Sequence, residues 1–246
     1  MNDSFLKNGI IHKFLINPGN RLDFCYTKTM KKKSRQNLQK IVGTSRNRPK
    51  KVAWIIGIDE VGRGPIAGPV TVCAFALKIE HINDIAKMGF KDSKKLSPQK
   101  REQFVQILNN CAHLDMCTWV IESSSSIMID SKGIVSSIQS ALDRCLKKLD
   151  IHPEHVDIYL DGGLHAPKNY FRQHTVIHGD DLFPVISCAS IIAKVYRDHM
   201  MEKLDLKYPE YGFIDNKGYG TASHYKAIKK YGPSDIHRMS FLSSVL

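Results

Sequence analysis

Residues 53–77 have the sequence Ala-Trp-Ile-Ile-Gly-Ile-Asp-Glu-Val-Gly-Arg-Gly-Pro-Ile-Ala-Gly-Pro-Val-Thr-Val-Cys-Ala-Phe-Ala-Leu, and this stretch decides the fold. Within it, residues 53–58 and 69–77 are apolar and rich in β-branched side chains, and a glycine-rich segment, 62–68, separates them. Such runs, bounded by glycine and proline, are typical of β-strands. The sequence therefore predicts that the domain begins with two strands joined by a loop.

Later segments show the patterns of two further strands and four helices. The first helix has the start signal of a serine cap followed by proline. The predicted elements are the strands 116–121 and 156–160, a helix that begins at Pro98, and helices at 133–149, 184–206 and 222–231. This order predicts one α/β domain, residues 52–246, with a mixed sheet flanked by helices and a helical C-terminal part.

The charge of the chain is unevenly distributed. The 246 residues carry a net charge of +12, which favours a polyanionic partner such as a nucleic acid. Residues 1–51 contain 13 basic and only 2 acidic residues, so nearly all of the excess lies there. We predict that they form a flexible basic arm. An organelle transit peptide or an over-extended start site has the same composition, so the sequence leaves the role of the arm open.

Cysteine spacing and hydropathy argue against several classes of protein. The 6 cysteines form no CxxC pair, and no histidines cluster at zinc-binding spacing, so neither a disulfide framework nor a structural zinc site is expected. No apolar run approaches the roughly 20 residues needed to cross a bilayer. We expect a cytoplasmic protein without membrane association or an obligate protein partner, while organelle targeting by the arm stays open.

Four carboxylates lie at the ends of apolar segments or next to glycines. Asp59 and Glu60 come at the end of the first predicted strand, Asp161 closes the last one, and Asp180 precedes the helix 184–206. Mg²⁺ and Mn²⁺ prefer such oxygen ligands. Neighbouring strand residues point to opposite faces, so the first two acids share a cation only if the strand twists or further acids complete the site. A single aspartate beside glycine is usually a turn or a cap, so the hypothesis depends on the combination.

The glycines of the first loop admit a second interpretation, a dinucleotide-binding turn. Gly62, Gly64 and Gly68 have the spacing GxGxxxG, and Pro65 lies where the following helix would begin. No Gly-Lys-Ser/Thr sequence is present to form a P-loop. The spacing therefore argues against a nucleotide cofactor.

Several motifs, in order, resemble the signature of the ribonuclease HII family. They are Asp59-Glu-Val-Gly-Arg-Gly-Pro65, Asp92-Ser-Lys-Lys-Leu96, Leu160-Asp-Gly162, Gly179-Asp180 followed by Ile186-Ser-Cys-Ala-Ser-Ile-Ile-Ala-Lys194, and Lys217-Gly-Tyr-Gly-Thr221. His237-Arg-Met-Ser-Phe241 resembles the closing motif of the family. The match spans about residues 54–242. The resemblance implies an RNase H-like fold, with Asp59, Glu60, Asp161 and Asp180 holding two divalent ions, Mn²⁺ or Mg²⁺.

The resemblance also implies a set of substrate contacts. The backbone of Gly62, Arg63 and Gly64 is expected to recognise the ribose 2′-OH, and Tyr219 to stack on the sugar of the next nucleotide. Phosphate contacts are implied for three neighbouring residues, Ser93, Lys94 and Lys95. A solvated turn ahead of the following helix is an equally good interpretation of the two lysines.

Details of the sequence differ from the family pattern or need resolving. Asp161 is followed by two glycines rather than by one glycine and a polar residue, and an asparagine usual in the family is replaced near residues 129–133. Asp181 lies next to Asp180, and we assign the latter because it directly follows a glycine. Asp198 lies four residues after Lys194, so we expect an ion pair on a helix face rather than a metal ligand.

The implied activity is that of an endoribonuclease that cuts the RNA strand of RNA–DNA hybrids and nicks duplex DNA 5′ of an embedded ribonucleotide. Two-metal hydrolysis would leave 5′-phosphate and 3′-hydroxyl ends. A ribonuclease HIII type typically lacks the arginine between the glycines, and a non-catalytic nucleic-acid-binding relative would lack at least one acid. Arg63 and all four acids are present, which favours the HII type.

Overall fold

The computed structural model describes residues 52–88, 96–177 and 179–243. The predicted basic arm, residues 1–51, lies outside the described residues, and so do Ser93, Lys94 and Lys95. Their expected contacts stay predictions. Among the described residues, no helix combines the length and the hydropathy that crossing a membrane requires. The five cysteines of the described residues are all free and buried.

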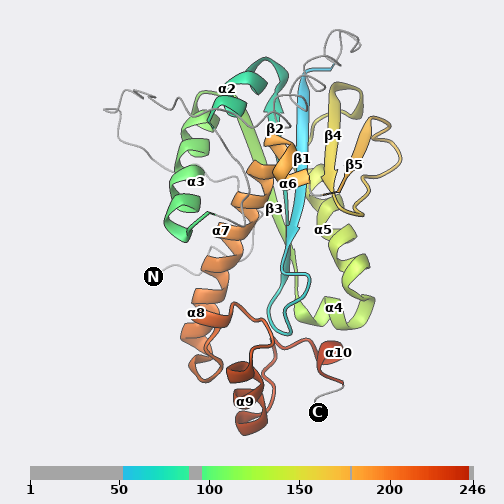
Figure 1. The fold of residues 1–246 in the computed structure, drawn as a ribbon. Coiled ribbons are helices and arrows are strands. Elements are labelled where there is room, and N and C mark those ends of the chain that lie inside the picture. Colours follow the sequence, from blue (N-terminus) through green and yellow to red (C-terminus); the bar gives the residue numbers. More distant parts are fainter. Residues whose placement is uncertain (1–51, 89–95, 178, 244–246) are drawn as a thin grey trace.

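A mixed sheet of five strands forms the centre of the protein (Figure 1). The strands are β1 (Trp54–Val61), β2 (Val70–Lys78), β3 (Cys117–Ser124), β4 (Val156–Asp161) and β5 (Gln173–Val176). Their order across the sheet is β3-β2-β1-β4-β5. β1, β2 and β3 are antiparallel neighbours, whereas β4 is parallel to β1 and β5 is parallel to β4. The predicted mixed sheet is confirmed.

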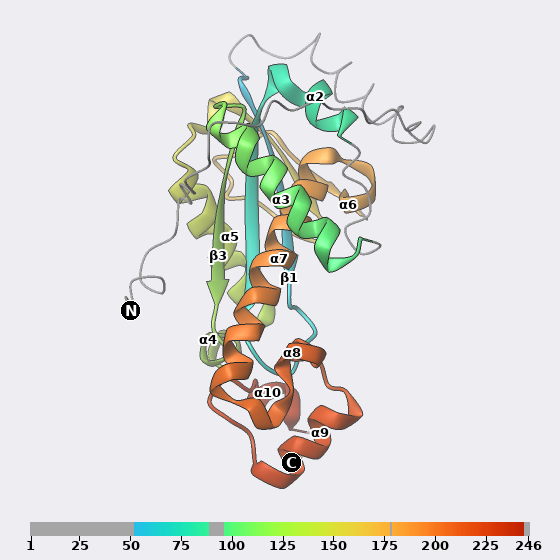
Figure 2. The same cartoon turned by 90° about the vertical axis from the view of Figure 1, so that its left-hand side faces the viewer.

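Helices cover both faces of this sheet (Figure 2). α5 (Ile134–Leu149) packs on β2 and β3, and α7 (Pro184–Lys207) packs on β1 and β2 from the other side, with α3 (Pro98–His113) against α7. Side chains of β1 alternate between the two layers. Ile55 belongs to the apolar cluster under α7, and Ile56 and Ile58 belong to the cluster under α5.

The C-terminal part forms a third apolar cluster below the sheet (Figure 1). It contains α8 (Phe213–Asn216), α9 (Ala222–Tyr231) and α10 (Met239–Leu242). Phe213 and Met201 lie at its centre, and Ile66 and Ala67 from the loop after β1 belong to the same cluster. The glycine-rich loop is therefore packed into the C-terminal part. Short elements complete the chain: η2 (Ile79–His81), α2 (Ile82–Lys87), α4 (Ser126–Lys132), η4 (Pro153–His155), α6 (Gly179–Leu182) and η5 (Pro209–Tyr211).

The long elements match their predicted positions, and the differences lie at ends and in short segments. β1 continues to Val61, three residues past the predicted end, because Asp59, Glu60 and Val61 still pair with residues of β2. β5 and the short helices were not predicted, since four to seven residues are too few to show a periodicity.

Gly57 determines how closely the start of α7 approaches β1. A Cβ atom on Gly57 would lie 2.2 Å from the carbonyl group of Val185, so only glycine leaves room for the helix backbone. We expect Gly57→Ala to lower the free energy of unfolding by about 2 to 3 kcal/mol, because the helix has to move off the sheet. Urea or thermal unfolding measures the change. Gly163→Ala is the control, since a Cβ there meets nothing within 4 Å, and equal stabilities of the two variants would contradict this explanation.

Candidate active site at the ends of β1 and β4

Asp59 and Asp161 lie next to each other on neighbouring parallel strands. Ile58 of β1 pairs with Leu160 of β4, so the following residue of each strand is one of these acids. Because Ile58 and Leu160 both face α5, the two acids lie on the α7 face. Burial raises the pKa of Asp59 to about 8, a hydrogen bond from Ser190 of α7 opposes the rise, and the carboxylates of Glu60 and Asp161 add to it. The site thus brings carboxyl groups together in a buried place, where the charged form of Asp59 is unfavourable.

The Glu60 side chain lies on the opposite face of the sheet from Asp59. Its partner across the strand pair is Val72, which belongs to the cluster under α5. The Glu60 carboxylate lies 3.4 Å from a guanidinium nitrogen of Arg63. Burial raises the pKa of Glu60, Arg63 opposes the rise, and Asp161 adds to it. Glu60 is therefore coupled electrostatically to the acids on the opposite face.

Asp180 approaches the other acids from α6. The Gly179 N–H donates a hydrogen bond of 2.7 Å to Asp161 Oδ1, which ties the start of α6 to the end of β4. The Ser187 hydroxyl of α7 donates to the Asp180 carbonyl oxygen. Asp180 is buried, and Asp181 is exposed. The structure therefore buries Asp180, rather than its neighbour, one residue after the amide that bonds to Asp161.

The four acids match divalent cations in their chemistry. Carboxylates are the hard oxygen donors that Mg²⁺ and Mn²⁺ prefer. Burial and, to a smaller extent, the neighbouring carboxylates raise the pKa of Asp59, and a bound cation would oppose both effects. In the described part of the chain, however, no three acidic, histidine or cysteine side chains are already arranged to hold one metal ion. The donor types fit the metals, the structure couples Asp59, Glu60 and Asp161 electrostatically, and the roles of all four acids as ligands stay predictions.

The loop after β1 and the Tyr219 ring meet beside the acids. Gly62 has a φ angle of +88°, a conformation that favours glycine, and a Cβ there would collide with the side chain of Arg197. A Cβ on Gly64 would lie 3.9 Å from the ring of Tyr219, which is 47% exposed. The structure thus brings together the loop and the aromatic ring that the sequence places about 155 residues apart.

Two buried histidines connect Tyr219 to the end of the chain. His224 Nδ1 lies 2.9 Å from the Tyr219 carbonyl oxygen, which only accepts, so this nitrogen carries the hydrogen. His224 Nε2 then accepts from His237 Nε2 at 3.0 Å, and His237 Nδ1 accepts from the Ser234 N–H at 2.9 Å. Both rings are neutral and each tautomer is fixed. His224 was not predicted as a functional residue, because a lone histidine on a short helix has no periodic or spacing signal.

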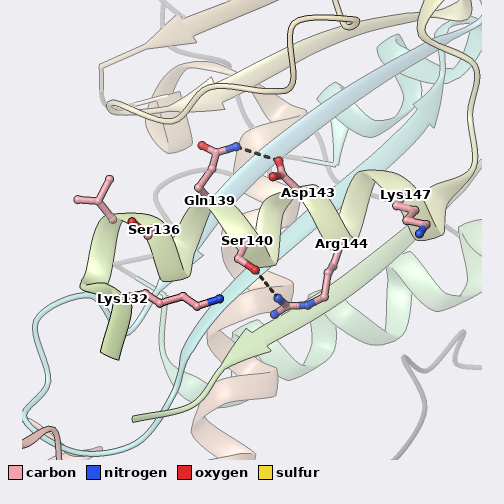
Figure 3. Close-up of a pocket in the computed structure, with 8 residues that line it drawn as sticks. Lys132, Ser136, Gln139, Ser140, Asp143, Arg144 and Lys147 are labelled. Atoms are coloured by element: carbon pink, nitrogen blue, oxygen red, sulfur yellow. Dashed lines mark hydrogen bonds between the residues drawn. The ribbon is translucent and has the colours of Figure 1, made fainter. Parts of the chain in front are cut away.

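An open groove on α4 and α5 contains none of the candidate site residues (Figure 3). Its lining residues are Lys132, Val135, Ser136, Gln139, Ser140, Asp143, Arg144 and Lys147. The polar side chains bond to one another, with Gln139 donating to Asp143 at 2.9 Å and Arg144 donating to Ser140 at 2.8 Å. We therefore locate the candidate active site by the buried acids and not by this groove.

Comparison with known proteins gives the family of the chain. The sequence profile of ribonuclease HII matches residues 56–244. The chain belongs to the ribonuclease HII family. The ribonuclease HII of Prochlorococcus marinus is 40% identical over 189 residues, which cover 77% of this chain and 96% of that protein. The ribonuclease HII of Clostridium perfringens is 42% identical over 193 residues, covering 78% and 68%. As a member of this family the chain is an endonuclease of the ribonuclease H type.

Solved structures of ribonucleases H share the fold. The ribonuclease HII of Archaeoglobus fulgidus, solved in a complex with PCNA, matches with a TM-score of 0.62 and 25% identity over 78% of this chain and 96% of that one. Ribonuclease H2 of Pyrococcus horikoshii matches with a TM-score of 0.60, 25% identity and the same shares of 78% and 96%. A Bst ribonuclease HIII in complex with Mn²⁺, at a TM-score of 0.54 and 22% identity over 74% of this chain and 64% of that one, shows the fold alone. The RNase H-like architecture is confirmed.

The buried pair His224 and His237 should make the free energy of unfolding depend on pH. Burial lowers the pKa of His237 to about 4, with His224 adding to the effect, and burial lowers the pKa of His224. Between the ordinary value of 6.5 and about 4, the unfolded chain binds more protons than the folded one, so stability falls as the pH falls through this window. We expect His237→Gln to lose less stability than the wild type on acidification.

Urea unfolding at about pH 7.5 and about pH 5 measures this difference. The carboxylates are common to both proteins, so comparing the wild type with the variant isolates the histidine. His165→Gln, a change at an exposed histidine, is the control and should follow the wild type. Parallel pH profiles for the wild type and His237→Gln would show that the pair does not contribute to acid sensitivity.

Proposed function

We propose that this ribonuclease HII cuts the RNA strand of RNA–DNA hybrids and nicks duplex DNA 5′ of an embedded ribonucleotide, leaving 5′-phosphate and 3′-hydroxyl ends. The observation that carries the proposal is the adjacency of two groups of residues. Asp59 and Asp161 are neighbours at the ends of β1 and β4, and the loop Gly62-Arg63-Gly64 follows β1 directly and meets Tyr219. A backbone that recognises a ribose is useful to a nuclease only when the scissile phosphate lies a few ångströms away.

The acids are the part of the site that performs hydrolysis. Asp59, Glu60, Asp161 and Asp180 would hold two divalent cations, Mn²⁺ or Mg²⁺, which supply an activated water and stabilise the leaving 3′ oxygen when bound. The protein holds two of these carboxylates in place by hydrogen bonds, from Ser190 to Asp59 and from the Gly179 amide to Asp161. The complex of a ribonuclease HIII with Mn²⁺ in a related fold supports the choice of metal.

The loop and the tyrosine are the part that selects ribose. The 2′-OH is the group that distinguishes RNA from DNA, so the selecting groups have to contact the sugar itself. Glycine at positions 62 and 64 lets the backbone come close to that hydroxyl, and the half-exposed Tyr219 ring offers a flat surface to the adjoining sugar. The Arg63 side chain, which is 54% exposed and lies 3.4 Å from Glu60, would add a phosphate contact to the backbone contact of this residue.

The metal-site assignment predicts the effect of a single change. Asp59→Asn keeps the size of the side chain and removes its charge, so cleavage of a duplex with one ribonucleotide should fall by orders of magnitude while duplex binding persists. Initial rates with Mg²⁺ or Mn²⁺ and with a chelator measure the loss. Asp181→Asn, at an exposed acid next to Asp180, is the control and should cleave normally. A near wild-type rate for Asp59→Asn would refute the assignment.

The recognition role of Tyr219 makes a second prediction. Tyr219→Ala should reduce cutting at a lone ribonucleotide far more than it reduces duplex binding, and more than it reduces cutting of an RNA-tract hybrid, because neighbouring riboses offer further contacts. Cleavage rates on both substrates, beside a melting curve, measure the effect. Tyr231→Ala, at a tyrosine that is 53% exposed on α9, is the control. Equal losses on both substrates together with a lower melting temperature would favour a structural role for Tyr219.

A further inference from the structure

Two fully buried arginines lie beneath the loop that follows β1. Arg197 of α7 and Arg238 of the closing motif are both 0% exposed. Burying a guanidinium is costly unless its N–H groups find acceptors. Here the acceptors are backbone carbonyl oxygens: Arg197 donates to those of Ala67, Pro69 and Lys217, and Arg238 to those of Gly62, Arg63 and Gly68. The two side chains thus support the loop from below.

Two of the three side-chain bonds of Arg238 go to the part of the loop that directly follows the acids of β1. Its Nη2 donates to the Gly62 carbonyl oxygen at 2.6 Å, and its Nη1 donates to the Arg63 carbonyl oxygen at 3.0 Å. The guanidinium is a rigid planar fork, so the two oxygens that it holds lie on the same side of the loop. Two consecutive carbonyl groups therefore point inward, towards the C-terminal part.

Peptide geometry determines where the neighbouring amides point. The described residues contain no cis peptide, and in a trans unit the N–H points away from the C=O of the same unit. The Gly62 carbonyl shares its unit with the Arg63 N–H, and the Arg63 carbonyl shares its unit with the Gly64 N–H. Both amides therefore face outward, and neither donates a hydrogen bond to another described residue. Two such amides side by side form a donor pair suited to an oxygen atom.

Arg238 is itself held firmly from both sides. Its own N–H donates to the Ile66 carbonyl oxygen at 2.8 Å, and the Phe241 ring lies 5.2 Å from its guanidinium carbon. The Asp130 carboxylate accepts from the amides of the next two residues, Met239 and Ser240, at 2.9 and 3.0 Å. Burial, together with the nearby Arg197, lowers the pKa of Arg238 to about 10, so it stays charged at neutral pH.

We propose that Arg238 is a positioning residue for ribose selection. Its fork turns the carbonyls of Gly62 and Arg63 inward, and in this way it presents the amides of Arg63 and Gly64 to the 2′ oxygen of the substrate. The inference rests on the proposed ribonucleotide cleavage and adds to it the group that fixes the orientation of the recognition loop. Arg238 acts through the backbone and contacts no reacting atom.

Arg238→Lys is the direct test, because lysine keeps the charge but lacks a planar fork that holds two carbonyls at once. We expect kcat/KM for a duplex with one ribonucleotide to fall by about tenfold to a hundredfold, mainly through kcat. The inhibition constant of an all-DNA duplex of the same sequence should stay unchanged, since it depends on contacts other than those to the 2′ oxygen. A structural role alone would not separate these two quantities.

Arg172→Lys is the matched control. Arg172 also donates to backbone carbonyls, those of Val156 and Pro153, but at the start of β4 and far along that strand from the acids. The control should lose stability without losing kcat/KM at temperatures where it is folded. If cleavage by both variants instead falls in step with their melting temperatures, Arg238 only stabilises the fold and the proposal is wrong.

A measurement on the wild type covers the case in which Arg238→Lys does not fold. Without added metal, a duplex with one ribonucleotide should shift the amide resonances of Arg63 and Gly64 more than an all-DNA duplex does. Equal shifts with both duplexes would overturn the proposal. The failures of the two ideas are distinguishable: a wild type that does not cut the ribonucleotide duplex refutes the proposed function, whereas a cutting wild type and an Arg238→Lys variant with unchanged kcat/KM refute only this inference.

Discussion

The parallel pairing of β1 with β4 is the contact on which the candidate site depends. It sets Ile58 opposite Leu160, and the two residues that follow, Asp59 and Asp161, become neighbours although about 100 residues separate them in sequence. Hydrophobic burial of the strands under α5 and α7 provides the stability that keeps two carboxylates close together. The raised pKa of Asp59 is the electrostatic consequence, since its charged form is desolvated and lies beside like charges.

The loop that leaves β1 is held by a different kind of interaction. The sheet is stabilised by apolar packing on both faces, whereas the carbonyls of Gly62, Arg63, Ala67 and Gly68 are held by guanidinium bonds from Arg197 and Arg238. Backbone hydrogen bonds and apolar packing of Ile66 and Ala67 add to this support. Leaving a buried carbonyl without a partner costs about 1 to 3 kcal/mol, so a loop with several satisfied carbonyls resists local rearrangement. Charged hydrogen bonds are also directional, and apolar packing is not. Polar support therefore suits a loop whose amides have to point one way.

The sequence predicted the elements that carry a periodic or capping signal. Ser97 accepts a hydrogen bond from the Lys100 amide, as its position before a proline predicts, and α7 ends within a residue of the expected place. Asp198 pairs with Lys194 on that helix, as expected. Arg197 was not predicted to be buried, because it lies beside Lys194 and Asp198, and a group of charged residues on a helix is usually a solvent-exposed face. Its burial depends on carbonyls some 130 residues earlier, and no local pattern reports contacts at that separation.

The charge distribution explains why support of the loop by Arg197 and Arg238 matters for selectivity. Outside residues 1–51 the chain carries 23 basic and 22 acidic residues, so the catalytic domain has almost no net charge with which to attract phosphates. Counterion release from a few basic side chains gives affinity without distinguishing RNA from DNA. Discrimination then depends on groups with a fixed direction close to the 2′ position. The groups that we propose for this role are the backbone amides of Arg63 and Gly64, and a backbone amide is only as well oriented as the carbonyl on the other side of its peptide plane.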